Sequence, residues 1–150
     1  MQIYPTLEDF TGAVGAELGP TDWLEITQDR VNLFADATDD HQWIHVDPER
    51  AASGPFGGTI AHGLLTLSLL PRFMHELYRV DGVTMAINYG INKVRFISPV
   101  PVGAKIRARS TIADITAVDG GAQATMVTTI ELEGAAKPAA VIESIIRYVK

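Results

Sequence analysis

Polar and apolar residues alternate with a period of two along the second half of the chain. In the segment 105–112 the even-numbered positions are apolar or small, and the odd-numbered positions include the charged residues. The segment 122–133 repeats this alternation, and the turn-forming sequences SPVPVG, DGG and EGAAKP separate the segments. Such alternation is typical of β-strands that bury one face. Together with the segments 85–96 and 139–149, it predicts four long strands in meander-like order.

The first and the last of these strands depart from simple alternation. In the first, apolar residues lie at odd-numbered positions as far as Ile91 and at even-numbered positions from Val94 onward. This change predicts a β-bulge near Asn92 and Lys93, because one extra residue moves the following side chains to the other face. The last segment, AAVIESIIRYV, is apolar on both faces, which predicts a central or covered strand.

A helical pattern precedes the strands, in the sequence HGLLTLSLLPRFMHELY from His62 to Tyr78. Its first turns are apolar on nearly every side, which predicts that protein surrounds them. Pro71 lacks a backbone donor and is expected to bend the helix, and the residues after it keep a single apolar face. A long antiparallel sheet curled around this one helix would bury the apolar faces of both, so the predicted class is α+β.

The N-terminal third gives weaker signals. We expect a short helix near the N-terminus and a short strand near Trp23 to Ile26, which would make a fifth strand of the sheet. Thr27 is a good N-cap for a helix that ends at about Thr38, with Val31 on its apolar face. Between this helix and the apolar one, the sequence RAASGPFGGTIAHG predicts an irregular loop.

Composition narrows the function classes. A chain of 150 residues with 47% apolar and 20% charged residues fits one folded domain, residues 1–150. A formal net charge of −6 argues against a nucleic-acid partner, and the absence of cysteine excludes disulfides and thiolate chemistry. The sequence starts without a secretory pattern, and its longest apolar run, LLTLSLLP, is far shorter than the roughly 20 residues of a membrane span. We therefore expect a cytoplasmic protein without membrane contact.

Titratable and aromatic residues concentrate in DDHQWIHVDP, residues 39–48. Asp40 and His45 are five positions apart, which places them on different faces of a helix and on opposite faces of a strand, so they meet only if the segment is a loop. Alternatively, Asp40 caps a chain end and His45 satisfies a hydrogen bond in the core. The spacing of His41 and His45 also fits a helical zinc pair, but Gln42 stands where a zinc protease needs its glutamate, and we expect no metal.

A second candidate group lies where the apolar helix begins, in TIAHGLL. Backbone N–H groups in a first helical turn lack internal acceptors, so Gly63 could present a bare donor to an anion. In the alternative interpretation Gly63 only relieves crowding at the helix start. For His62 the sequence does not favour a position in the site over a position packed against the sheet.

These residues carry a family resemblance. FADATDDHQWIHVDPERA, followed by GPFGGTIAHGLLTLSLLP, resembles the R-specific enoyl-CoA hydratases, also called MaoC-like dehydratases, and within them the NodN-like single-domain bacterial members. The strand sequence AINYGINKVRFISPVPVGAKIRA is similar to that subgroup as well. The resemblance implies a hot dog fold, in which a five-stranded antiparallel sheet wraps around a long central helix, and it implies pairing as a homodimer.

The resemblance also implies roles for individual residues. The family motif is Asp, any residue, Asn-Pro, an aliphatic residue and His, so Asp40 and His45 fall on its catalytic acid and histidine, and Gly63 falls on its oxyanion donor. Gln42-Trp43 replaces Asn-Pro here. We expect Gln42 and His62 to contact substrate.

The implied reaction is reversible addition of water to trans-2-enoyl-CoA, giving a (3R)-3-hydroxyacyl thioester without a cofactor, in fatty acid metabolism. The carrier is CoA or acyl carrier protein, whose phosphates could meet one of the basic strand residues Lys93, Arg95, Arg107 or Arg109. A hot-dog acyl-CoA thioesterase and a non-enzymatic acyl-CoA binding protein are the alternative functions.

Overall fold

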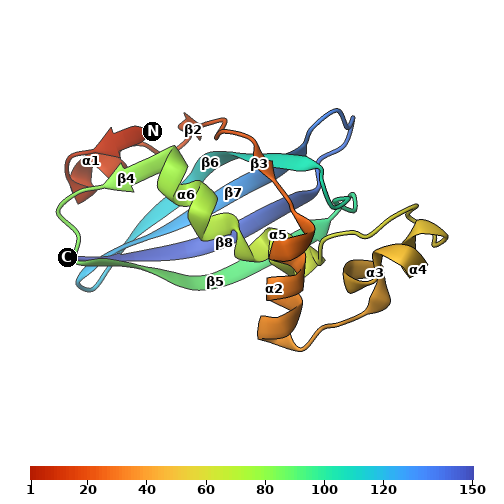
Figure 1. Ribbon diagram of the computed structural model, residues 1–150. Helices are drawn as coiled ribbons and strands as arrows, with labels where there is room; N and C mark the ends of the chain where they lie inside the picture. The colour runs from red at the N-terminus through yellow and green to blue at the C-terminus, as the bar shows by residue number, and fades with distance from the viewer.

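The computed structural model describes residues 1–150 as an antiparallel sheet crossed on one face by a helix (Figure 1). Its strands are β1 (Gln2–Tyr4), β2 (Glu17–Leu18), β3 (Leu24–Glu25), β4 (Tyr78–Val80), β5 (Met85–Phe96), β6 (Lys105–Val118), β7 (Gly121–Leu132) and β8 (Ala140–Val149). Its helices are α1 (Leu7–Thr11), α2 (Gln28–Thr38), α3 (Trp43–Val46), α4 (Pro48–Ala52), α5 (Gly63–Ser68) and α6 (Leu70–Leu77). The four long strands and the α+β class are as predicted.

Strand order in the main sheet is β2-β6-β7-β8-β5, and β3 also pairs with β6. The predicted meander is therefore correct for β6, β7 and β8 and wrong for β5, which pairs with β8 at the far edge and not with β6. The chain reaches β6 from β5 through the loop 97–104, which crosses the end of the sheet. The predicted fifth strand position is filled by two short pieces, β2 and β3, along β6.

The central helix is divided in two. α5 ends at Ser68, and Leu69 joins it to α6, where Pro71 occupies a first-turn position that needs no backbone donor. Leu65, Leu69 and Phe73 are buried against the sheet. The expectation that protein surrounds the first turns on every side is wrong for the single chain. Leu64 is 60% exposed, because the sheet covers one side of α5 and the outward side meets solvent.

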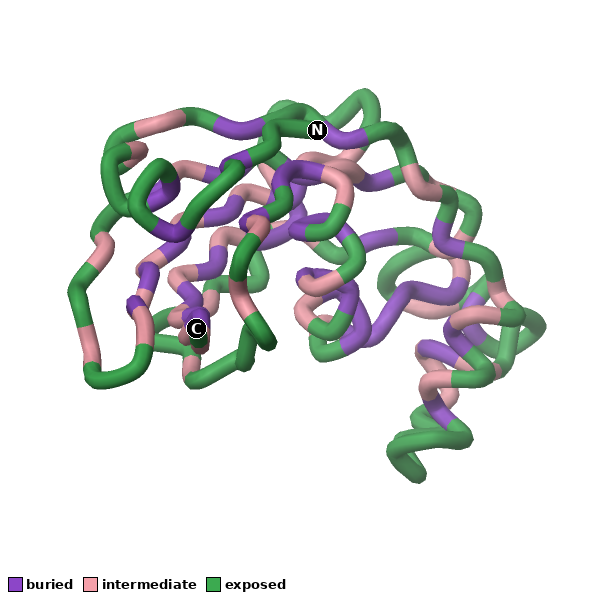
Figure 2. Tube along the Cα trace, turned by 90° about the vertical axis from the view of Figure 1, so that its left-hand side faces the viewer, coloured by how far each residue is buried: buried purple, intermediate pink, exposed green.

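Buried positions alternate with less buried ones along β6, β7 and β8, as the colours in Figure 2 show. The even-numbered residues face the helix, and the outer face carries ion pairs such as Arg107 with Glu131. β8 lies between β7 and β5, which confirms its prediction as a central strand. None of the helices has both the length and the apolar character needed to cross a membrane.

The edge strand β5 buries little of its apolar surface. Its register with β8 shifts between Ile91 and Lys93, which confirms the predicted bulge, and shifts again between Asn88 and Gly90, which was not predicted. Between them the two shifts leave apolar side chains on both faces of the strand. Six large apolar residues on or just after β5 are exposed: Met85, Ile87, Tyr89, Ile91, Phe96 and Ile97.

The two ends of the sheet are built differently. At one end α1, β1 and β4 close the core, with β1 and β4 forming a small parallel sheet. At the other end α2, α3 and α4 project beyond the sheet, next to the start of α5 (Figure 1). The segment that holds the candidate chemistry, residues 39–48, lies at this second end.

Candidate active site

The end of α2 positions Asp40. Thr27 caps the start of this helix by accepting a hydrogen bond from the backbone N–H of Arg30, as predicted, and the helix ends at Thr38. Asp39 follows with a φ of 59°, a left-handed conformation that aspartate tolerates better than most residues. The chain therefore turns sharply at Asp39, and the carboxylate of Asp40 is half exposed beside the start of α5.

His45 lies on the short helix α3 and is 7% exposed. Its Nδ1 is 2.7 Å from the carbonyl oxygen of Ile60. A carbonyl only accepts, so Nδ1 carries the proton and donates it to this bond. A neutral His45 therefore has its lone pair on Nε2, and it is Nε2 that is free to take a proton from another molecule.

Burial lowers the pKa of His45 below its ordinary value of 6.5, since a charged imidazole is poorly solvated there. The nearby ring of His62 lowers this pKa further, whereas the hydrogen bond to Ile60 and the charge of Asp40 raise it. The net effect favours a neutral imidazole near neutral pH, which is the form that can act as a base.

His62 is the residue before α5, and it is 3% exposed. Its ring stacks on the ring of His45 with centroids 3.8 Å apart. Its Nε2 lies 2.9 Å from the backbone carbonyl oxygen of Asp40 and therefore donates to it. The nearer carboxylate oxygen of Asp40 is 3.9 Å from the same nitrogen. His62 contacts these two residues and is not among the residues that line the neighbouring cavity.

The structure thus brings Asp40, His45 and His62 together. One carboxylate oxygen and one ring nitrogen from each histidine all lie within 4.8 Å of one another. A single water molecule can bridge two polar groups at such a separation. The stacked rings and the hydrogen bond from His62 Nε2 to the Asp40 carbonyl suit a proton-transfer pair better than the convergent geometry of metal ligands.

A cavity of about 340 Å³ opens beside His45. Most of its lining is apolar and comes from the start of α5, the end of β5 and the loops around Phe56 and Val100. The buried hydroxyl residue Thr66 and the backbone of Gly63 also face it. An apolar cavity with a few polar groups is typical of small-molecule sites. Asp40 is not among the residues that line this cavity, and its carboxylate lies beside the imidazoles of His45 and His62.

Gly63 is the first residue of α5, and its N–H has no hydrogen-bond acceptor in the chain. The ring of Phe96 lies against it, so that a Cβ added to Gly63 would be 3.1 to 3.2 Å from three atoms of this ring. Any side chain at position 63 would have to displace Phe96. Glycine therefore allows the close packing of Phe96 at this position, and Gly63, with its unpaired N–H, lines the cavity.

The other residues singled out in DDHQWIHVDP do not reach the cavity. Gln42 is exposed, its side chain makes no hydrogen bond, and only its backbone N–H approaches a carboxylate oxygen of Asp40, at 3.4 Å. Trp43 packs against Gly54 and lies under the guanidinium of Arg50.

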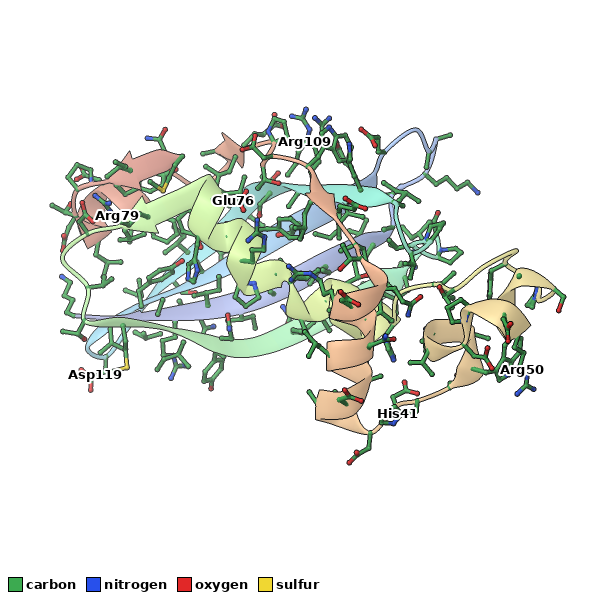
Figure 3. All side chains as sticks on the ribbon, in the orientation of Figure 1. His41, Arg50, Glu76, Arg79, Arg109 and Asp119 are labelled. Carbon is green, nitrogen blue, oxygen red and sulfur yellow. The ribbon has the colours of Figure 1, made fainter.

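His41 Nε2 donates to the carboxylate of Asp36 on α2, and this hydrogen bond raises the pKa of His41. It is exposed and lies on the segment between α2 and α3 (Figure 3). The zinc pair of His41 and His45 is therefore not supported, because the two side chains have different partners and only His45 belongs to the cluster with Asp40.

Two residues that the sequence did not single out hold the site together. The side-chain amide of Gln28 donates to the backbone carbonyl of His45 at 2.8 Å and accepts from the hydroxyl of Thr59 at 2.6 Å. Gln28 thereby joins α2, α3 and the loop before α5. No local pattern reveals it, since its partners are 17 and 31 positions away.

The basic strand residues lie on the outer face of the sheet. Arg107 and Arg109 both pair with Glu131, which lowers the pKa of that carboxyl. Lys93 and Arg95 have no ion pair and line a shallow hollow on β5. Only these two are free to meet an external phosphate.

The sequence matches the family described as MaoC like domain over residues 9–135. It is 59% identical over 150 residues to 3-hydroxyacyl-thioester dehydratase Z of Mycobacterium tuberculosis (strain ATCC 25618 / H37Rv), with 99% of each chain covered. It is 45% identical over 139 residues to Nodulation protein N of Rhizobium leguminosarum bv. viciae, covering 89% of this chain and 85% of that protein.

Solved structures share the fold. An (R)-hydratase from A. caviae involved in PHA biosynthesis has a TM-score of 0.70 at 26% identity, covering 89% of this chain and 94% of that one. A monoamine oxidase regulatory protein from Archaeoglobus fulgius has a TM-score of 0.78 at 22% identity, covering 99% and 97%. These likenesses confirm the predicted hot dog fold.

Proposed function

Because the chain belongs to the MaoC-like dehydratase family and is therefore a hydro-lyase, we propose that it reversibly adds water to trans-2-enoyl thioesters and forms (3R)-3-hydroxyacyl thioesters. In the hydration direction the oxygen of water bonds to Cβ and a proton is added at Cα, with no net oxidation or reduction. Negative charge develops on the thioester oxygen in between. The reaction needs groups that move two protons and a donor that stabilises this oxygen.

Asp40 and His45 are the groups proposed to move the protons. The observation that carries the proposal is their separation: a carboxylate oxygen and a ring nitrogen lie within 4.8 Å, close enough to hold one water between them. The lowered pKa of His45 supports a neutral imidazole that accepts a proton from this water and returns one to Cα. The two groups interact, so they exchange protons as a pair.

Gly63 is proposed to stabilise the developing oxyanion. Its N–H has no partner in the chain, and Gly63 lines the cavity beside His45. A donor fixed in place before the reaction pays no reorganisation cost when the charge appears, and loss of one such donor typically reduces the rate by about 10² to 10³. Thr66 supplies a second polar group in the same cavity.

The acyl thioester is proposed to enter this cavity with its thioester group near Gly63. The carrier is CoA or acyl carrier protein, and Lys93 and Arg95 are the basic residues free to meet its phosphates. Gln42 is proposed to contact the carrier at the surface, because its exposed side chain is unbonded and lies next to Asp40. No metal or organic cofactor is required by this chemistry.

We also propose a homodimer formed through β5, in the cytoplasm. The apolar side chains of this edge strand are exposed in the single chain, such as Met85 (53%) and Tyr89 (54%), and neighbouring exposed apolar side chains are typical of interaction surfaces. The strand also leaves one row of backbone groups unpaired, which favours pairing with another strand. A two-fold dimer would cover both.

The test uses the purified full chain and crotonyl-CoA. Hydration removes the enoyl absorbance and releases no thiol, and chiral chromatography of the product is expected to give the (3R) isomer. Release of free CoA, measured with a thiol reagent, would instead indicate a thioesterase. Saturable binding without conversion would indicate an acyl-CoA binding protein, and either result would contradict the proposal.

A further inference from the structure

A second buried imidazole lies against His45 and has no part in the proton transfers proposed above. His62 is 3% exposed and stacks on His45, with an interplanar angle of 24°. The ring of Phe34 also contacts it, with centroids 4.9 Å apart. Aromatic contacts of this kind would be made equally well by a phenylalanine at position 62.

The polar atoms of His62 are not satisfied as those of a core histidine usually are. Nε2–H donates to the carbonyl of Asp40, but Nδ1 is buried and has no hydrogen-bond partner. Burying an unpaired nitrogen costs free energy, which a phenylalanine would avoid. Stability therefore does not explain a histidine here, and the feature that distinguishes it from phenylalanine is the hydrogen bond to Asp40.

That hydrogen bond is the main anchor of Asp40. The residue follows the left-handed turn at Asp39 and belongs to no helix or strand. Asp40 makes one other hydrogen bond, from the backbone N–H of Gln42 to its carboxylate, and this is long, at 3.4 Å. Without His62, nothing short would hold the backbone of Asp40 beside the imidazole of His45.

We propose that His62 is a positioning residue: its Nε2–H holds the carbonyl of Asp40 while its ring packs on His45, which keeps the carboxylate and the imidazole at a separation that one water bridges. The inference rests on the proposed dehydratase function and adds a residue to it. His62 itself moves no proton and touches no substrate in this scheme.

The stacked ring also acts on the charge of His45. Asp40 and His62 are the titratable side chains that face His45, and His62 lowers the pKa of His45 whereas Asp40 raises it. Replacing His62 by a side chain that cannot be protonated is therefore expected to raise the pKa of His45. A residue that served only to fill space would leave this pKa where it is.

The kinetic test compares two substitutions in the full chain. His62→Phe keeps a ring and removes the donor, whereas His62→Gln keeps a donor that can reach the position of Nε2. Phe34→Leu is the matched control, because it changes the packing on His62 and leaves its hydrogen bond. For crotonyl-CoA hydration we expect His62→Phe to lower kcat about 10- to 100-fold with KM within about threefold, and His62→Gln and Phe34→Leu to stay within about fivefold of the wild type.

A spectroscopic test does not depend on turnover. In 1H–15N spectra of the imidazoles we expect the wild-type His62 to be protonated on Nε2 and not on Nδ1, and the pKa of His45 to rise in His62→Gln. If the wild type hydrates no enoyl thioester, the proposed function fails, and these spectra still decide the position of the proton on His62. Wild-type kcat in His62→Phe, equal losses in the Phe and Gln variants, or a proton on Nδ1 of His62 would overturn the inference.

Discussion

Two neighbouring residues and its burial keep the imidazole of His45 in the neutral form that can act as a base. Ile60 fixes the tautomer, burial disfavours the charged form, and His62 adds to that preference. From their spacing, Asp40 and His45 could meet only in an irregular segment, and it was the family resemblance that implied a shared role for them. The sequence did not predict that His45 would sit on a short helix, or that a second histidine 17 residues further along would stack on it.

The pH dependence of activity follows from the lowered pKa of His45. The neutral imidazole is the active base, so the acidic limb of the kcat/KM profile for crotonyl-CoA is expected to have its midpoint below pH 6.5, the ordinary pKa of histidine. The limiting slope is about tenfold per pH unit for loss of one essential deprotonated group. A midpoint above pH 6.5 on the acidic side would mean that the pKa of His45 is raised, contrary to its buried position.

The contact between the start of α5 and the end of β5 depends on the absence of a side chain at position 63. Gly63→Ala would place a methyl group against the ring of Phe96, which lines the cavity and would have to shift. We expect kcat/KM to fall about tenfold or more. The double variant with Phe96→Ala is expected to recover part of this loss, because the obstructing ring is removed. If the loss in the double variant equals the sum of the losses in the two single variants, on a free-energy scale, the two residues act independently.

The joining of α2, α3 and the loop before α5 depends on Gln28. Gln28→Leu leaves the carbonyl of His45 and the hydroxyl of Thr59 without their partner, so we expect the free energy of unfolding to fall by about 1–3 kcal/mol in urea titrations. Gln42→Leu is the matched control, since the side chain of Gln42 makes no hydrogen bond, and it should change stability by about 0.5 kcal/mol or less. Equal stability of the two variants would contradict the role assigned to Gln28.

Local sequence patterns predicted most of the helices and strands. They did not predict which strands pair when the two strands are distant in sequence. The cap at Thr27, the interruption of the central helix near Pro71 and the bulge near Asn92 all follow from neighbouring residues, and all are present. The position of β5 at the far edge could not be derived from its own alternation, because pairing depends on how the loop after it crosses the sheet. The second bulge, at Tyr89, was hidden because an apolar residue there continues the apparent alternation.

The apolar side chains of β5 are exposed in the single chain, and we propose that a second copy of the chain covers them in a homodimer. We expect the wild-type chain to show twice the mass of one chain in light scattering coupled to size-exclusion chromatography. Met85→Lys combined with Ile87→Lys should yield monomer, because two charges on the edge strand disfavour burial. Val14→Lys, a change at a residue that is 50% exposed in the loop after α1, is the control and should remain dimeric. A monomeric wild type would contradict this proposal and leave the exposed strand unexplained.

The central claim is that Asp40 and His45 share the water that adds to the double bond, and Asp40→Asn tests it most directly. Asp39→Asn is the matched control, since it makes the same change at the adjacent position and asparagine tolerates the left-handed backbone there. With crotonyl-CoA we predict that kcat/KM falls about 10³-fold in Asp40→Asn and stays within about threefold in Asp39→Asn, with unchanged circular dichroism in both. A rate near that of the wild type in Asp40→Asn would contradict the claim.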